Sequence, residues 1–510
     1  MLLRISQTIR ALQENRMLGW PCLVIFFLFC FSISNVRAQS SDTLDLKEMQ
    51  ELKTTLSSYI QFRSISGYEK EAAWFLAQYA RSKGLNAEIL TEGDSTSNLC
   101  ISLFPIQDNK PTILLLSHID VVQADDSLDW SNPPFSGKIS GDTVWGRGAL
   151  DCKGLTFIHL YSILQLKKQS DWNSLPLNVA ILALAGEETG GFNGAAVVSE
   201  YFLSQLNAVV VLGEGGAGLQ NIIPSQPSKR VYNVSVAEKT NLWLKLELGF
   251  KTFGHGASPP RNYVNKMMLK ALSKLSSNEG NIEFNKTNKR MFRHLGELEG
   301  GFTGWVIQRF HWPIFRPVVK KYIRREPFLG ALVRNTYVLT NLFNPPGPPN
   351  QIPNRITAYL DCRLLPGTNR KKFIRQIKYG LFEPRFKIST INECPEAEES
   401  SPNSPFYKLF EKAVQQQDKE AAVLPVLFPA SSDNNYFRAR GLNVYGIFPF
   451  MMTDEDLISI HGINEKITGR QIQTGIGITS TFLKLANDEM KAGKSLKMPS
   501  KGYFKSKFKE

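Results

Sequence analysis

The side chains in this sequence best suited to chemistry are two histidines and five acidic residues, several of which directly follow a short apolar run. In chain order they are His118, Asp120, Asp151, Glu187, Glu188, Glu214 and His461. Imidazole and carboxylate ligands without thiolate are typical of zinc and similar divalent cations in catalytic sites. A site for two such cations needs one carboxylate that bridges them and separate ligands for each ion. This set of residues could supply both.

Each of these residues also has an ordinary structural explanation. A histidine two residues before an aspartate at a strand end is usually part of a local hydrogen-bonded pair, as His118 and Asp120 would be. Asp151 could cap the helix that follows it. Glu187 and Glu188 could form the acidic first turn of another helix. All these explanations would have to hold together, which favours one common site.

The apolar runs that precede these residues predict buried strands of a parallel sheet. They are 111–117, 177–184 and 208–212. Continuous apolar runs separated by helical patterns, here 154–168 and 194–205, are typical of strands covered on both faces. In open α/β sheets, functional residues gather outside the carboxyl ends of the strands. The reactive side chains of this sequence fall at those ends.

A different pattern begins near residue 240. The stretches 241–250 and 355–363 alternate apolar and polar residues, which predicts half-exposed antiparallel strands. Between them, 286–346 is rich in Arg, Lys and aromatic residues. We therefore expect an α/β protein with a mostly parallel central sheet, interrupted by a smaller α+β domain. The expected division is a signal peptide over 1–38, a catalytic domain over 45–238 and 396–490, the inserted domain over 239–395, and a basic tail over 491–510.

The motifs around these residues resemble those of the M20 metallopeptidases, and in particular the branch that contains carboxypeptidase S (Gly-Xaa carboxypeptidase) and the secreted N-fatty-acyl-amino acid hydrolase. The similarity extends from about residue 50 to residue 485. The motifs, in the order of the family, are SHIDVV (117–122), WGRGALDCKG (145–154), AGEETGG (185–191), LGEGG (212–216), GHGASPP (254–260), NQIP (350–353), DCRLLPG (361–367) and ISIHGINEKI (458–467). The basic aromatic stretch 290–340 also resembles the lid extension of that branch.

The resemblance implies a zinc-peptidase-like catalytic domain with two zinc ions in each subunit, for which Co²⁺ or Mn²⁺ could substitute. One ion would be held by His118 and Glu214. The other would be held by Glu188 and His461, and Asp151 would bridge the two.

The resemblance also implies roles for residues that would not bind metal. Glu187 would be the general base and acid, and Asp120 would orient the ring of the first histidine ligand. In the family the inserted domain is a lid and a dimer interface, and it carries a histidine that reaches the partner's active site to stabilise the oxyanion; the matching position is His255. Asn350 and Arg363 match the lid residues that hold the carboxylate of the substrate, which suits the fork of a guanidinium. Without the family match, Arg363 would be interpreted as a surface strand residue in an ion pair.

The loop 430–435 and Cys152 lead to two further expectations. The loop 430–435 reads Ala-Ser-Ser-Asp-Asn-Asn where the family commonly has Gly-Thr-Asp-Ser. Because this loop lines the substrate pocket in the family, the change bears on specificity rather than on metal binding. Cys152, beside Asp151, is expected to be structural and not nucleophilic, since no neighbouring cation and base accompany it. No disulfide is expected.

These assignments predict an exported metallopeptidase of the carboxypeptidase or dipeptidase type, which cleaves an amide bond next to a free C-terminal carboxylate. An N-acyl-amino acid amidohydrolase with an acyl pocket is the alternative, because the ligands and the base would be the same. A non-catalytic binding protein on the same fold is a further alternative. It is disfavoured because every ligand position and Glu187 are present.

The first 38 residues predict a targeting segment. Arg4, Arg10 and Arg16 precede the apolar run 22–33, and small or polar residues follow it up to Ala38. This run is short for a bilayer span, which favours a cleaved signal peptide and a secreted or periplasmic protein. The alternative is an uncleaved segment that anchors the protein in a membrane.

The charge balance is strongly basic, with 60 Lys and Arg against 46 Asp and Glu and a formal net charge of +14. Eight of the cations lie among aromatic residues between 290 and 325, and seven Lys lie in the tail. No recognised nucleic-acid module accompanies them, so no nucleic-acid partner is expected. Cations interleaved with aromatic residues favour contact with a membrane surface or an amphiphilic substrate.

Overall fold

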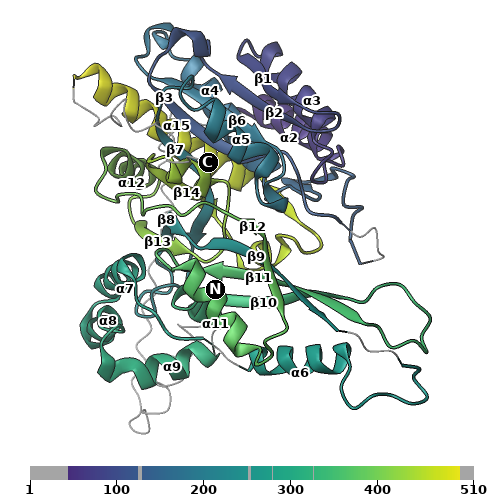
Figure 1. Cartoon of the computed structure of the whole chain (residues 1–510). Helices are drawn as coiled ribbons and strands as arrows, with labels where there is room; N and C mark the ends of the chain where they lie inside the picture. The colour runs from purple at the N-terminus through teal and green to yellow at the C-terminus, as the bar shows by residue number, and fades with distance from the viewer. Residues whose placement is uncertain (1–43, 125–128, 251–253, 278–279, 326, 494–510) are drawn as a thin grey trace, which may run out of the picture.

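The computed structural model of the chain describes residues 44–124, 129–250, 254–277, 280–325 and 327–493. The expected signal peptide (1–38) and all but the first three residues of the expected basic tail (491–510) lie outside the described residues. Within the described part, no helix combines the length and the apolar character needed to cross a bilayer. The described chain forms a large sheet with helices around it and a smaller sheet below (Figure 1).

The large sheet has eight strands in the order β1-β2-β6-β3-β7-β14-β8-β13. Their bounds are β1 (Asn86–Glu92), β2 (Ser97–Ser102), β3 (Thr112–His118), β6 (Asn178–Leu184), β7 (Ala208–Leu219), β8 (Val231–Glu238), β13 (Ala422–Phe428) and β14 (Val444–Met451). The central pairs β6–β3, β3–β7 and β7–β14 are parallel, whereas β1 and β2 pair antiparallel at one edge. The predicted mostly parallel α/β sheet is confirmed.

Strand β3 explains why its sequence is continuously apolar. Ile113 and Leu115 belong to one hydrophobic cluster, and Leu114 and Leu116 belong to another. Successive side chains of a strand point to opposite faces, so the two clusters lie on the two sides of the sheet. The helices packed around this sheet are α2 (Leu46–Ile60), α3 (Lys70–Ser82), α4 (Lys153–Lys167), α5 (Val197–Tyr201), α12 (Pro405–Gln417), α13 (Asn434–Ala439) and α15 (Gly469–Lys491).

The smaller sheet is antiparallel, with four strands in the order β10-β11-β9-β12. Its elements are β9 (Thr240–Gly249), β10 (Thr336–Phe343), β11 (Arg355–Leu364), β12 (Lys387–Glu393), α6 (Val264–Ser276) and α11 (Arg370–Gly380). Buried residues alternate with partly exposed ones along β9 and β11, and the buried set packs with α6 and α11 in a separate core. The alternating sequence pattern therefore corresponds to a sheet with one covered face.

Four helices that follow α6 and precede β10 in the sequence contribute their described buried hydrophobic residues to the core of the large sheet and not to that of the smaller sheet. They are α7 (Lys286–Glu299), α8 (Gly301–Gln308), α9 (Arg316–Arg325) and α10 (Pro327–Leu332). Phe292 and Leu295 of α7 belong to the same hydrophobic cluster as Leu424 of β13, and α7 contacts β13 directly. In Figure 1, α7, α8 and α9 lie together below β13, beside the smaller sheet.

The remaining described elements are short and complete the loops around the strand ends. They are β4 (Ile139–Ser140), β5 (Thr143–Trp145), β15 (Lys466–Thr468), α14 (Asp454–Ser459), the single turns Ile106–Asp108, Trp172–Ser174, Glu187–Thr189 and Pro313–Phe315, and a π-helical turn over Phe192–Ala196.

Candidate active site

His118 is the last residue of β3, and its ring is fixed by the residue two positions later. Its Nδ1 donates to the backbone carbonyl oxygen of Asp120 over 2.8 Å. This bond directs Nε2 toward Asp151 Oδ1, 3.0 Å away, and Glu214 Oε2, 3.5 Å away. A histidine held through one nitrogen presents the other as a ligand.

The carboxylate of Asp120 has a second task, which is to hold the turn after β6. It accepts hydrogen bonds from the backbone N–H groups of Glu187 and Glu188, both over 3.1 Å, and from Ser66 Oγ over 2.7 Å. Its Oδ1 lies 3.6 Å from His118 Nδ1. Asp120 therefore positions both the histidine and the two glutamates, although its direct bond to the ring is made by the main chain.

Asp151 occupies the centre of the cluster, in the loop between β5 and α4. Its Oδ1 faces His118 Nε2, while its Oδ2 lies 3.3 Å from His461 Nε2. His461 Nε2 is also 3.1 Å from Glu188 Oε2. One carboxylate thus offers one oxygen to each of two histidines, which is the geometry that a bridging ligand requires.

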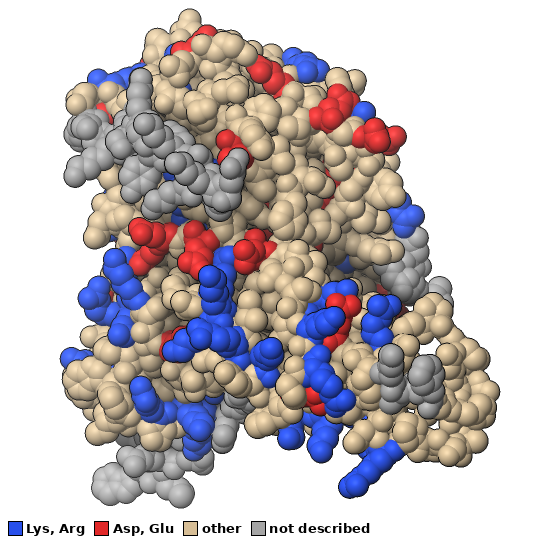
Figure 2. Space-filling view, in the orientation of Figure 1, with Lys and Arg blue, Asp and Glu red and all other residues tan. Residues whose placement is uncertain are grey.

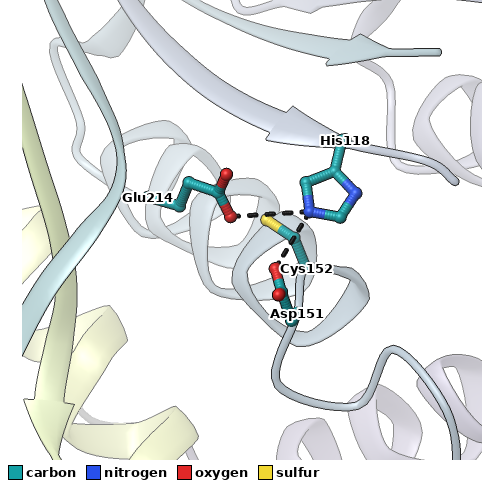
Figure 3. Close-up of side chains that lie close together, drawn as sticks. All are labelled: His118, Asp151, Cys152 and Glu214. Atoms are coloured by element: carbon teal, nitrogen blue, oxygen red, sulfur yellow. Dashed lines mark hydrogen bonds and ion pairs between the residues drawn. The ribbon is translucent and has the colours of Figure 1, made fainter. Parts of the chain in front are cut away.

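Glu214 and Cys152 complete the side of the cluster that contains His118. Figure 3 shows both side chains pointing toward the histidine ring, with Glu214 reaching it from β7. Cys152 is fully buried, and burial raises the pKa of its thiol well above the usual range. The four cysteines of the described chain are all unpaired, as expected.

The electrostatics of the cluster are dominated by buried carboxylates. Burial raises the pKa of Glu187 well above its usual range, with the charge of Glu214 adding to the effect. Burial likewise raises the pKa of Glu188, and that of Glu214 to about 7. Burial also acts to raise the pKa of Asp151, but hydrogen bonds from the two histidines outweigh it and hold that pKa far below its usual range. The group holds more negative charge than its own residues can balance, and a divalent cation would supply the difference.

The donor set fits a metal ion. The ligand atoms of His118, Asp151, Cys152 and Glu214 lie within 4.8 Å of one another, as do those of Asp151, Glu188 and His461. Carboxylates and imidazoles suit zinc and similar divalent cations. Oε1 of Glu188 is buried without a hydrogen-bond partner among the described residues, which is a costly state for an oxygen that no cation satisfies. All five predicted metal ligands are brought together at the strand ends.

Glu465 is a residue of this site that sequence reasoning missed. It is 1% exposed, and its carboxylate accepts from the Arg147 guanidinium over 2.8 Å. It also accepts from the backbone N–H groups of Gly148, Leu150 and Asp151, each over 2.9 Å. Glu465 therefore holds the loop that carries the central carboxylate. Its presence in the ISIHGINEKI motif was the only signal, and that signal does not reveal its contacts.

The cluster forms part of the lining of a cavity of about 610 Å³. Its charged lining residues include Asp151, Glu187, Glu188, Glu214, Arg363 and His461. Its apolar lining includes side chains of α7, α10 and β13, namely Met291, Phe292, Leu295, Leu332, Leu424, Val426 and Leu427. The loop 430–433 forms part of the wall, where the family resemblance implies a pocket-lining loop.

Arg363 lies on β11 and is one of the residues that line this cavity. Its Nε contacts Asp361 Oδ1 and Oδ2 over 3.0 and 3.1 Å, and Asp361 Oδ1 accepts from Trp243 Nε1 over 3.0 Å. This arrangement engages Nε and leaves the two terminal nitrogens without a partner among the described residues. The terminal nitrogens are therefore available to a ligand carboxylate.

His255 and Asn350 are not among the described residues that line the cavity. They are paired with each other, with Asn350 Nδ2 at 3.0 Å from His255 Nε2, and both are exposed. They lie on an arm beyond the ends of β9 and β11, where Gly256 N–H donates to the Asn350 carbonyl over 2.8 Å. In a single chain the structure does not bring these two residues to the ligand cluster.

An α/β sheet whose strand ends carry three overlapping groups of potential metal ligands, one of which contains Glu187 with His118 and Glu188, is characteristic of metal-dependent hydrolases. The comparison with known families is more specific: residues 114–485 match the model of Peptidase family M20/M25/M40. The chain belongs to this family and is an enzyme of the metallopeptidase and amidohydrolase type.

Several relatives extend over most of the chain. It is 29% identical over 369 residues to "Probable carboxypeptidase S-like 2" of Dictyostelium discoideum, which covers 71% of this chain and 69% of the relative. It is 28% identical over 399 residues to "N-fatty-acyl-amino acid synthase/hydrolase PM20D1" of Mus musculus, with 76% of each chain covered. Both names correspond to the carboxypeptidase S and N-fatty-acyl-amino acid hydrolase branch that the sequence motifs resemble.

Solved structures share the fold. The M20 family metallo-carboxypeptidase Sso-CP2 from Sulfolobus solfataricus superimposes with a TM-score of 0.63 at 20% identity, covering 86% of this chain and 99% of its own. Human carnosine dipeptidase 1 superimposes with a TM-score of 0.61 at 15% identity, covering 86% and 97%.

Proposed function

We propose that this protein hydrolyses the amide bond of N-acyl amino acids that carry an apolar acyl chain. The observation behind this choice is the cavity, whose lining combines a cationic side chain, the ligand cluster and a group of apolar side chains that we call the apolar chamber. A small polar peptide would leave the apolar lining without apolar contacts, whereas a hydrocarbon chain would bury apolar surface against it. A carboxypeptidase or dipeptidase is the second candidate, supported by the similarity to carboxypeptidase S-like relatives.

In this proposal the substrate is held at both ends. Arg363 binds the free carboxylate through its terminal nitrogens, and Asp361 keeps the guanidinium in place. The acyl chain extends between α7 and β13, against Leu295 and Leu424. The amide carbonyl then lies between these two ends, at the ligand cluster.

The residues around the amide divide the chemistry. The cofactor would be two zinc ions held by His118, Glu214, Asp151, Glu188 and His461, and such ions polarise a carbonyl and make water nucleophilic near neutral pH. Glu187 takes a proton from the attacking water and delivers it to the leaving nitrogen. The water oxygen adds to the amide carbon, and the C–N bond then breaks as the nitrogen takes up the proton, which yields a carboxylic acid and an amino acid.

A homodimer is part of the proposal because His255 and Asn350 are separated from the cluster in one chain. Strand β10 lies at the edge of the smaller sheet and exposes apolar residues, including Val338 and Phe343. Exposed apolar edge strands are pairing surfaces. A partner that pairs there would bring its arm to this chain's site, where its histidine would stabilise the oxyanion. Export to the periplasm or the medium remains the proposal for location and rests on the N-terminal pattern alone.

The test is hydrolysis of one panel by the purified protein loaded with zinc. The panel contains N-lauroyl-, N-butyryl- and N-acetyl-phenylalanine and a set of dipeptides, each with and without a chelator. We expect chelator-sensitive turnover that rises with acyl length. Turnover confined to dipeptides would replace the first candidate by the second. A metal-loaded dimer that turns over no member of the panel would contradict both and favour the binding-protein alternative.

A further inference from the structure

Helix α8 and the residues just after it expose a group of large apolar side chains. Phe302 is 79% exposed and Ile314 is 76% exposed, while Trp305 and Trp312 are 42% and 43% exposed. Side chains of this size are normally covered when they occur together. We call this surface, together with the cations described next, the aromatic–basic face.

The rings of this face form one connected array. Phe302 stacks on Trp305 with 5.9 Å between ring centroids, and Trp305 meets Trp312 edge-on at 6.3 Å. The Arg309 guanidinium lies 4.4 Å from the Trp305 ring and 5.3 Å from the Trp312 ring. The array is therefore held in place before any partner binds, so binding to it costs little conformational entropy.

The charged residues in this stretch of the sequence are of one sign. Residues 301–325 contain six Lys and Arg and no Asp or Glu. Arg316, Lys320 and Lys321 of this group are exposed on α9. Figure 2 shows Lys and Arg gathered over the lower half of the molecule, where Figure 1 places α7, α8 and α9. A second copy of this chain would bring equal positive charge against the face, which opposes self-association there.

A helix that packs against this face forms part of the wall of the active-site cavity. Phe292 and Leu295 of α7 line the cavity, and α8, which carries Phe302 and Trp305, packs on α7. The apolar chamber and the exposed apolar surface thus involve two helices that contact each other directly. Only this helix pair separates the chamber from the aromatic–basic face.

We propose that the aromatic–basic face docks on an anionic lipid bilayer. Aromatic and aliphatic side chains would enter the region between headgroups and acyl chains, and the Lys and Arg side chains would contact anionic headgroups. Docking would also present the chamber to amphiphiles dissolved in the same bilayer. The proposal concerns binding and does not require the substrate assigned above.

The test is co-sedimentation of the purified full chain with phosphatidylcholine vesicles, with and without phosphatidylserine. We expect binding to the anionic vesicles that weakens as salt is added. F302S/I314S changes two of the most exposed apolar residues of the face, and R316E/K320E/K321E reverses three cations. Each is expected to lower the apparent affinity by about tenfold or more, because the first removes apolar area that would enter the bilayer and the second replaces attraction to anionic headgroups by repulsion.

Matched controls come from the smaller domain. L269S/Y379S removes two apolar residues that are 59% and 77% exposed, and K371E/K372E/R375E reverses three exposed cations of α11. Both controls should bind as the unchanged protein does. Turnover of a short-chain soluble substrate should be the same in all four variants, which separates loss of docking from loss of fold or catalysis.

Three results would overturn the proposal. One is absence of sedimentation with anionic vesicles at low salt, and another is equal loss of binding in the face variants and their controls. The third is a change of oligomeric state in F302S/I314S, seen by analytical ultracentrifugation, with vesicle binding intact, because the face would then contact a second chain. Vesicle binding without any hydrolytic activity would contradict the proposed function and leave this proposal standing.

Discussion

Glu465→Gln is the substitution that most directly tests how the central carboxylate is positioned. Glu465 accepts four hydrogen bonds through its two oxygens, three of them from the backbone of 148–151 and one from Arg147. A glutamine has nearly the same shape but only one acceptor oxygen, and its amide group would face donors. The substitution also leaves the Arg147 side chain, which is 4% exposed, without its charged partner.

The magnitude follows from these contacts. Removing one partner of a buried ion pair destabilises a protein by about 3–5 kcal/mol, and each unsatisfied buried donor adds about 1–3 kcal/mol. Since relaxation of the loop would recover part of this, we expect a loss of about 3–5 kcal/mol in the free energy of unfolding. Displacement of Asp151 should also lower metal affinity about 10- to 100-fold, as loss of residues that orient ligands usually does.

Urea unfolding of the metal-free protein and zinc titration measure the two effects separately. Glu455→Gln is the matched control, because Glu455 is 78% exposed in its ion pair with Lys466 and should change stability by less than about 1 kcal/mol. Glu465→Asp keeps the charge, so its unfolding free energy and zinc affinity should fall between those of the two glutamine variants. It can be measured even if Glu465→Gln does not fold. An unfolding free energy and a zinc affinity for Glu465→Gln that match those of Glu455→Gln would refute the reasoning.

Three further predictions use other parts of the molecule. Glu187→Gln should abolish turnover while zinc content stays nearly unchanged, measured by steady-state kinetics and metal analysis; retained activity would exclude Glu187 as the proton carrier. Leu295→Trp should fill part of the apolar chamber and lower kcat/KM for N-lauroyl-phenylalanine while leaving N-acetyl-phenylalanine within about twofold; equal losses on both would place the acyl chain elsewhere. Burial lowers the pKa of His159 to about 3, whereas the pKa of an unfolded histidine is near 6.5. Between these two pH values, unfolding should therefore take up a proton at His159. The free energy of unfolding should then fall as the pH falls from about 6.5 toward about 3. His159→Leu should remove on the order of 2 kcal/mol of the difference in unfolding free energy between about pH 8 and about pH 5. If chemical unfolding showed the same difference with and without the substitution, the pKa of His159 would not be lowered in the folded protein.

The large sheet and the ligands were predictable for physical reasons. Strands β3 and β6 are covered on both faces, so their sequences are continuously apolar and stand out without any alignment. Ligands placed at the ends of such strands converge because parallel strands end at one edge. The family resemblance then implied different roles for neighbours, with Glu188 as a ligand and Glu187 as the base, and these roles stay predictions.

Contacts between distant segments were not predictable in the same way. Glu465 and the backbone it holds at 148–151 are more than 300 positions apart, and no property of either segment alone reveals their contact. The same is true of Glu238 at the end of β8, which accepts from Ser432 and Asn434 and so holds the loop beside the cavity. The donors that pair with a buried acceptor of this kind are set by the tertiary structure, since distant segments supply them.

The helices α7–α10 show most clearly where a sequence pattern stops being informative. Apolar periodicity predicts that a helix such as α7 has one face to bury, but it does not identify the surface that covers it. Their position between β9 and β10 in the chain suggested that they extend the smaller domain, whereas Phe292 and Leu295 pack with the core of the large sheet. That packing creates the apolar chamber next to the ligands. The chamber on which the proposed long-chain amidohydrolase activity rests therefore arises from tertiary packing, and the motifs that amidohydrolases and peptidases of the family share carry no information about it.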